Sequence, residues 1–114
     1  MNWISLTTAE QLEEIKEKSK STPQLIFKHS IRCGTSAMVK NRLDTGTAPS
    51  TIDFYYLDLI NYRAISNQVA DEFMVSHESP QILLISNGEC VYDESHIGIK
   101  MRDIEQKASE LIRQ

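Results

Sequence analysis

The distribution of apolar and polar positions along the chain predicts alternating helices and strands. Short runs of apolar, β-branched and aromatic residues between turn-forming residues are typical of strands. Apolar residues spaced three or four positions apart are typical of helices with one buried face. We therefore expect strands at residues 24–29, 52–58, 81–86 and 89–94. We expect helices from Thr7 to before Pro23, from just after Cys33 to residue 43 or 44, from Asn61 to near Val75, and around residues 104–111.

Some of these boundaries carry capping or turn signals. Thr7 and Glu10 have the spacing of a capping box, in which Thr7 is the N-cap and Glu10 reaches back to its backbone. Asn87-Gly88 predicts a two-residue hairpin turn, and Asn61 is a suitable N-cap for the third helix. Lys100 is a poor N-cap, so the sequence does not fix where the last helix begins.

The order of the elements predicts the fold class. A helix between two successive strands favours parallel pairing, whereas a two-residue hairpin must be antiparallel. We therefore expect an α/β protein with a mixed four-stranded sheet flanked by helices. Such sheets bind ligands at the carboxyl ends of their strands, so the residues that follow a strand are the first candidates for a site.

Cys33 is the principal candidate for chemistry, because it follows the first predicted core strand and stands just ahead of a helix. A thiol there meets unpaired backbone N–H groups and the positive end of the helix dipole, and both favour the reactive thiolate. Lys28, His29 and Arg32 add positive charge nearby, and the Ser36 hydroxyl could donate a hydrogen bond to the thiolate. The alternative is a buried, inert cysteine, which the polar and cationic flanking residues make the weaker interpretation.

Composition and charge narrow the function further. The 114 residues are 40% hydrophobic and 25% charged, as expected of a globular protein. A net charge of −4 argues against nucleic acid as the main partner, because phosphate binding needs a basic surface. No apolar run approaches the ~20 residues of a membrane span, and residues 1–5 lack the features of a signal peptide. We therefore expect a cytoplasmic location, where cysteines remain reduced.

Cys90 and the three histidines have simpler interpretations than catalysis. Cys90 lies within a predicted strand, so a packed structural thiol is favoured. A resolving role would require it to approach Cys33, because Cα atoms more than ~7 Å apart cannot be bridged without backbone movement. His29, His77 and His96 lack the compact spacing of zinc ligands, so no metal is expected.

Several segments together resemble the YtxJ family of monothiol bacilliredoxins. They are Lys28-His29-Ser30, Cys33 with Ser36 three residues later, His77-Glu78-Ser79-Pro80-Gln81, and Ser95-His96. The resemblance covers nearly the whole chain and implies a single thioredoxin-like domain over residues 1–114. It also implies thiol–disulfide exchange with mixed disulfides between proteins and bacillithiol, a low-molecular-weight thiol used where glutathione is absent.

The resemblance assigns roles to individual residues. Cys33 would be the attacking thiol; Arg32, Gly34, Ser36 and His77 would stabilise the thiolate or line the site; and Ser79, Pro80 and His96 would face the substrate. The Ser79–Pro80 peptide bond is expected to be cis. A histidinium at His77 would stabilise the thiolate near neutral pH. Gly34 departs from the family, whose members often have proline there, and is expected to loosen the first helical turn.

The expected mechanism uses one thiol, because Ser36 occupies the position of a second cysteine. Cys33 would take bacillithiol from S-bacillithiolated client proteins, and free bacillithiol or another redoxin would regenerate it. Bacillithiol would thus be a co-substrate, with no bound cofactor. Two alternatives remain open at this point: a non-catalytic thioredoxin-like module that binds a peptide, and a redoxin that uses a different small thiol.

Overall fold

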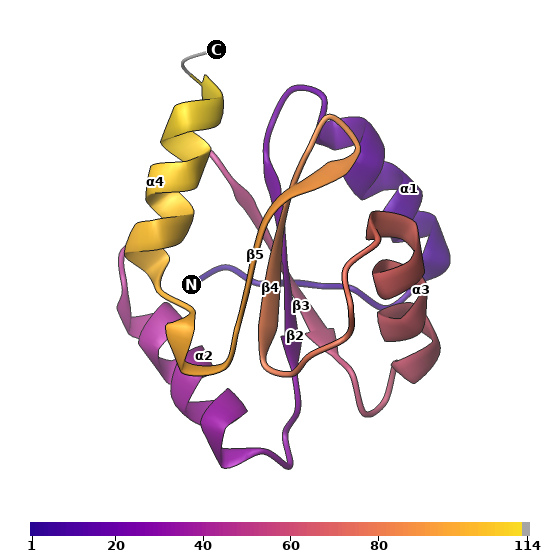
Figure 1. Cartoon of the computed structure of the whole chain (residues 1–114), viewed down its shortest axis with the longest axis vertical. Helices are drawn as coiled ribbons and strands as arrows, with labels where there is room; N and C mark the ends of the chain where they lie inside the picture. Colours follow the sequence, from indigo (N-terminus) through magenta and orange to yellow (C-terminus); the bar gives the residue numbers. More distant parts are fainter. Residues whose placement is uncertain (113–114) are drawn as a thin grey trace.

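The computed structural model describes residues 1–112, which form a five-stranded sheet covered by helices on both faces (Figure 1). The strands are β1 (Ile4–Ser5), β2 (Gln24–His29), β3 (Asp53–Asp58), β4 (Gln81–Ser86) and β5 (Glu89–Ser95). The helices are α1 (Ala9–Lys18), α2 (Gly34–Thr45), α3 (Arg63–Phe73) and α4 (Met101–Ile112), with a single 3-10 turn, η1 (His96–Gly98).

The sheet has the order β1-β3-β2-β4-β5, which places β2 at its centre. β2 pairs with β3 in parallel and with β4 in an antiparallel register, and β4 and β5 form the predicted antiparallel hairpin. The expectation of four strands was wrong by one, because Ile4 and Ser5 pair with Tyr55 and Tyr56 at the edge of the sheet. Two exposed residues carry no alternating pattern, so only their pairing with β3 identifies them as a strand.

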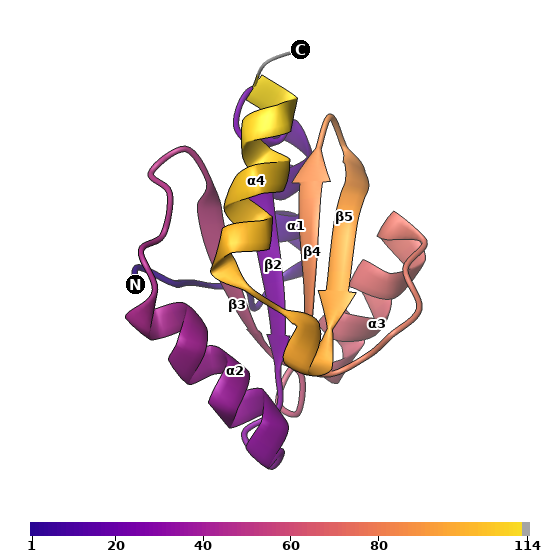
Figure 2. The same cartoon turned by 60° about the vertical axis from the view of Figure 1, so that its left-hand side comes forward.

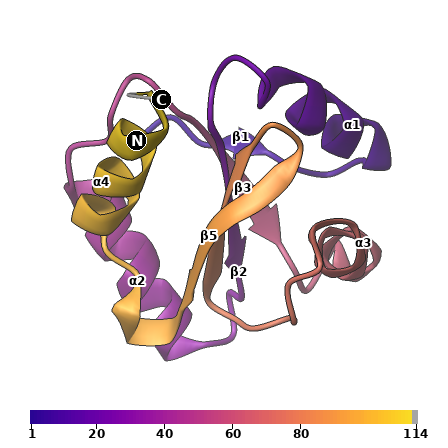
Figure 3. The same ribbon diagram turned by 45° about the horizontal axis from the view of Figure 1, so that its top comes forward.

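The central strand is buried on both faces, as its continuous apolar run predicts. Leu25 and Phe27 pack with residues of α2 and α4, whereas Ile26 packs with residues of α1 and α3. Figure 3 shows these two pairs of helices on opposite sides of the sheet, and Figure 2 shows α2 and α4 in front of it. Each such side chain stabilises the fold by about 1.5–3 kcal/mol when it is fully buried.

Two helix starts differ from the sequence prediction. The N-cap of α1 is Thr8, whose hydroxyl accepts from the Gln11 backbone N–H, while the Gln11 side chain accepts from the Thr8 backbone. The capping box is therefore one residue later than predicted. α3 begins at Arg63 after Tyr62, and the Asn61 side chain donates instead to Asp58 at 2.7 Å. At α1 a neighbouring threonine offers the same hydrogen-bonding chemistry, whereas the N-cap of α3, Tyr62, makes no side-chain cap hydrogen bond, so spacing alone does not decide either boundary.

The two-residue hairpin turn predicted at Asn87-Gly88 is confirmed. Asn87 and Gly88 have φ angles of 52° and 78°, the left-handed conformations that a tight two-residue turn requires. Val91 is the extra residue of a bulge, because Leu84 pairs with Tyr92 while Ile85 pairs with Cys90. Within residues 1–112, no helix is long and apolar enough to cross a membrane.

Candidate thiol–disulfide site

Cys33 is the N-cap residue of α2, at the end of the turn that follows β2. Its backbone is extended, with φ −113° and ψ 120°, and its side chain is partly exposed. The N-terminus of α2 has no side-chain cap and no acidic residue in its first turn. The first N–H groups therefore have no side-chain acceptor of their own, and a thiolate at the N-cap position is the natural acceptor for them.

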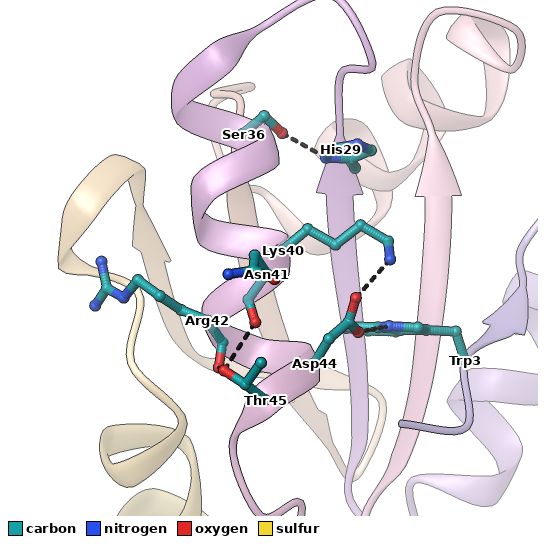
Figure 4. A network of polar contacts seen from close by, with 8 residues as sticks. All are labelled: Trp3, His29, Ser36, Lys40, Asn41, Arg42, Asp44 and Thr45. Atoms are coloured by element: carbon teal, nitrogen blue, oxygen red, sulfur yellow. Dashed lines mark hydrogen bonds and ion pairs between the residues drawn. The ribbon is translucent and has the colours of Figure 1, made fainter.

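Ser36 bonds to the strand rather than to the thiol. Its buried Oγ accepts from the Ser30 backbone N–H at 3.1 Å and lies 2.7 Å from Nδ1 of His29 (Figure 4). Because the hydroxyl oxygen already accepts one hydrogen bond, its proton is available to His29 Nδ1. In place of the predicted hydrogen bond to the thiolate, the Ser36 hydroxyl makes hydrogen bonds that link the first turn of α2 to the end of β2. Ser36 holds Cys33 in position indirectly.

The electrostatics of His29 agree with this arrangement. Burial lowers the pKa of His29, and the charge of Lys40 acts in the same direction, against the carboxylates of Asp58 and Asp44. A neutral imidazole whose proton is on Nε2 can accept at Nδ1 from the Ser36 hydroxyl. The body of α2 is fixed further along, where Asp44 accepts from Lys40 and from the Trp3 indole, both at 2.7 Å (Figure 4).

Lys28 and His77 meet on the opposite face of β2. Lys28 is completely buried, and its Nζ donates to the Ser66 carbonyl at 3.0 Å and lies 3.2 Å from His77 Nδ1. Burial lowers the pKa of Lys28 to about 8. Burial also lowers the pKa of His77, as do the charges of Lys28 and Arg63. A lowered pKa favours a neutral His77 ring, which weighs against the predicted histidinium beside the thiolate.

The Ser79–Pro80 peptide bond is cis, as the family resemblance implies. Lys28 is paired with Gln81 across the sheet, which places the residues just before Gln81 at the carboxyl end of β2, the end that Cys33 follows. The carbonyl of Pro80 accepts from the His96 backbone N–H at 2.9 Å, and His96 Nε2 lies 3.3 Å from Glu78. The turn before η1 is thereby tied to the cis-proline segment.

Arg32 and Gly34, the other residues predicted to line the site, are exposed to solvent. They lie beside Cys33, and a Cβ added to Gly34 would meet no atom within 4 Å. Nothing in the packing thus requires glycine there. The exposed apolar residues Ile31 and Ile97 lie in the turn before Cys33 and in η1, which packs against α2. Sequence reasoning had not selected either of them, because a single exposed apolar residue carries no pattern.

Cys90 lies at the other end of the sheet. It pairs with Ile85, which is opposite Gln24 at the start of β2, whereas Cys33 lies beyond His29 at its end. The six residues of β2 span roughly 16 Å from first to last, far beyond the reach of a disulfide. Burial raises the pKa of the Cys90 thiol to about 11, and its Sγ contacts the Tyr92 carbonyl at 3.4 Å. Cys90 is a structural thiol, and a resolving role is contradicted by its position.

A protein-family model described as monothiol bacilliredoxin BrxC matches residues 4–104. The chain belongs to this family. A solved structure described as a provisional oxidoreductase with a thioredoxin fold is 31% identical, with a TM-score of 0.79 and 90% of each chain covered.

Two thioredoxins show the same fold at low identity. The thioredoxin of Trypanosoma brucei brucei is 14% identical, with a TM-score of 0.74 and 99% of this chain and 93% of that chain covered. The thioredoxin of Malassezia sympodialis is 12% identical, with a TM-score of 0.72 and coverages of 96% and 90%. The bacilliredoxin is therefore a thiol–disulfide oxidoreductase with a thioredoxin-like fold.

Proposed function

We propose that this bacilliredoxin removes bacillithiol from protein mixed disulfides through Cys33 alone. The observation that carries the proposal is the isolation of one partly exposed thiol at an uncapped helix N-terminus. The position of a second cysteine is occupied by Ser36, which contacts His29. Cys90 lies a strand length away from Cys33, so no second thiol is within reach of it. A chain built this way can exchange a disulfide but cannot close one of its own.

The exchange has two steps. The Cys33 thiolate attacks the bacillithiol sulfur of the mixed disulfide; the old S–S bond breaks, and the client thiolate leaves and takes a proton from water. Cys33 is then joined to bacillithiol. A second thiolate, from free bacillithiol or another redoxin, attacks the sulfur of that bacillithiol and releases Cys33 as a thiolate. The rate of such an exchange depends in part on access to the attacking sulfur, and the Cys33 side chain is partly exposed at the start of α2.

The surroundings of Cys33 suit an extended client chain. The backbone of Ser79 precedes the cis-proline at the same end of the sheet and would pair with the client as an additional strand. Ile31 and Ile97 offer apolar contacts beside it. The client is thus held by its backbone and by nonspecific apolar contact, so many sequences would be accepted.

The test is the reduction of a bacillithiolated protein that has a single cysteine, followed by mass spectrometry. We expect bacillithiol to move from the client to Cys33, and we expect Cys33→Ser to abolish the transfer while Cys90→Ser leaves it intact. A parallel reaction with the glutathione mixed disulfide separates bacillithiol from another small thiol. No adduct on Cys33 from either substrate would contradict the proposal and favour a non-catalytic binding module.

A further inference from the structure

Lys28 is an anomaly in an otherwise ordinary core. Its side chain is 0% exposed at the centre of the sheet. Among the described side chains, no aspartate or glutamate lies within ion-pair distance of its Nζ. Its contacts are a carbonyl of Ser66 and an imidazole nitrogen of His77. Buried lysines are almost always paired with an anion, so the molecule holds a positive charge that is not neutralised from within.

His77 connects this buried charge to the surface. Its ring is exposed, but Nδ1 points inward, 3.2 Å from Lys28 Nζ and 3.3 Å from Ser66 Oγ. An ammonium has only donors, so Nδ1 must accept and the single ring proton must reside on Nε2. The exposed ring therefore offers an N–H donor that is polarised by the cation behind it. The lowered pKa of His77 agrees with a neutral ring.

The neighbouring charges make the same region attractive to an anion. Arg63 is exposed and close enough for its charge to lower the pKa of His77. The first turn of α3, which Arg63 begins, has no acidic residue and no side-chain cap. One carboxylate opposes this: the charge of Glu78 raises the pKa of His77, against the effects of Lys28 and Arg63, while its Oε2 lies 3.3 Å from His96 Nε2. In the next residue, Ser79, the hydroxyl is buried without a hydrogen-bond partner among the described residues.

This cationic pair lies beside the exchange site. Lys28 is paired with Gln81, the residue after the cis-proline, and the turn to Cys33 starts two residues after Lys28. We propose that Lys28 and His77 form a recognition site for a carboxylate carried by the small thiol of the substrate, with His77 Nε2–H as the donor and the Lys28 ammonium as the charge behind it. This inference rests on the proposed exchange at Cys33 and names the class of small thiol: an anionic one.

The test compares one client protein that carries three different small thiols on its single cysteine. The mixed disulfides with 3-mercaptopropionate, 2-mercaptoethanol and cysteamine add a negative, a neutral and a positive group, respectively. Each rate of transfer to Cys33 is divided by the rate of the uncatalysed exchange with dithiothreitol. We expect the anionic adduct to be preferred over the cationic one by about tenfold, the size of one charge-assisted hydrogen bond, and mainly through KM.

The variants then assign that preference to residues. Lys28→Met and His77→Leu should each abolish the preference, whereas His77→Gln, which keeps a donor near the Nε2 position, should retain part of it. Lys16→Met is the matched control, because Lys16 pairs with Glu72 and lies on α1. If Lys28→Met does not fold, the two His77 variants still decide the question.

The outcomes separate this inference from the proposed function. If the wild-type protein transfers all three small thiols to Cys33 equally well, the anion site is wrong and the exchange function stands. If Lys28→Met slows all three adducts equally, Lys28 acts on Cys33 or on the fold, and the inference is again overturned. A preference that follows acidic residues of the client, with none for the small thiol, would also overturn it. If no adduct reaches Cys33, the proposed function itself fails.

Discussion

The two ends of the central strand are built in opposite ways. At the thiol end (residues 28–33 and 77–81), α2 begins without a side-chain cap and a lysine is buried without a carboxylate. At the hairpin end (residues 19, 24 and 86–90), Ser19 accepts from the Gly88 N–H at 2.8 Å with its hydroxyl and from the Asn87 N–H at 2.9 Å with its carbonyl. Each end carries one cysteine, and only the one at the thiol end is placed for exchange.

The comparison shows that the destabilising features of the fold are concentrated at the thiol end. An uncapped helix N-terminus and a buried, unpaired ammonium each raise the free energy of the folded state. Such features persist where a site needs them, and they are offset elsewhere by packing. At the hairpin end the thiol is half-buried, and the one buried side-chain atom without a partner among the described residues there, Gln24 Oε1, is neutral, so its cost is smaller than that of a buried charge. Substitutions at matched positions of the two ends should therefore differ in their effect on turnover, on stability or on both.

The largest effect is expected from Ser36→Ala. The change leaves His29 Nδ1 and the Ser30 N–H without their partner, at a cost of about 1–3 kcal/mol in unfolding free energy. It should also slow the exchange at Cys33, because the first turn of α2 loses its tie to β2. Chemical denaturation and single-turnover transfer measure the two quantities.

Ser19→Ala is the matched control at the hairpin end, where a serine hydroxyl accepts from Gly88. It should lower stability by a similar amount and leave the rate of transfer unchanged. Equal losses of rate in both variants would mean that turnover follows global stability, and the positioning role of Ser36 would have to be given up.

Lys28→Met is expected to stabilise the protein, by about 1–2 kcal/mol at pH 7, because it replaces a buried charge with an apolar side chain. The pKa of Lys28 is lowered to about 8 in the folded chain, against ~10.4 when unfolded. Between these values the unfolded chain binds more protons, so the wild type gains stability as pH rises and the variant lacks this gain.

Denaturation at pH 7 and pH 9 checks both statements, and the advantage of the variant should shrink at pH 9. Lys16→Met, at an ion-paired and partly exposed lysine, should instead change stability by less than about 1 kcal/mol at either pH. A destabilised Lys28→Met protein at both pH values would show that the ammonium is a structural hydrogen-bond donor, and the contrast between the two ends would lose its main support.

Lys28 and Ser36 also show what could and could not be predicted from the sequence. The strands from Gln24 and Gln81 were predictable because their apolar runs fit no exposed element, and the hairpin because Asn-Gly favours its turn. Cys33 could be selected as the candidate reactive thiol because it follows a strand and precedes a helix. The burial of Lys28 could not be predicted, because a charged residue is expected to be exposed unless its contacts in the folded protein are known. The partner of Ser36 was missed for a related reason: spacing gives the helix position but not which side chain faces it.

A smaller effect is expected from Gly34→Ala. An added Cβ at Gly34 meets no atom within 4 Å, and the residue is the first of α2, so alanine fits without strain. Because alanine restricts the unfolded chain more than glycine does, the variant should gain about 0.4–1 kcal/mol. At the hairpin end, Gly88 has a φ of +78°, so Gly88→Ala should destabilise the protein. Thermal unfolding of both variants measures the contrast, and a destabilised Gly34→Ala would reveal a packing constraint at the thiol end.

The smallest effect on turnover is expected from Cys90→Ala. Cys90 pairs with Ile85 at the far end of β2 from Cys33, and burial raises its thiol pKa to about 11, so little of it is thiolate at pH 7 to 8. The transfer rate should stay within about twofold of wild type, because Cys33 alone makes and breaks the disulfides. Single-turnover transfer at pH 7.5 gives the rate, and peptide mapping after oxidation reports any Cys33–Cys90 bond. A large loss of rate, or that bond in the folded protein, would mean that the sheet opens enough to join its two ends, and the monothiol mechanism would have to be replaced by one with an internal resolving thiol.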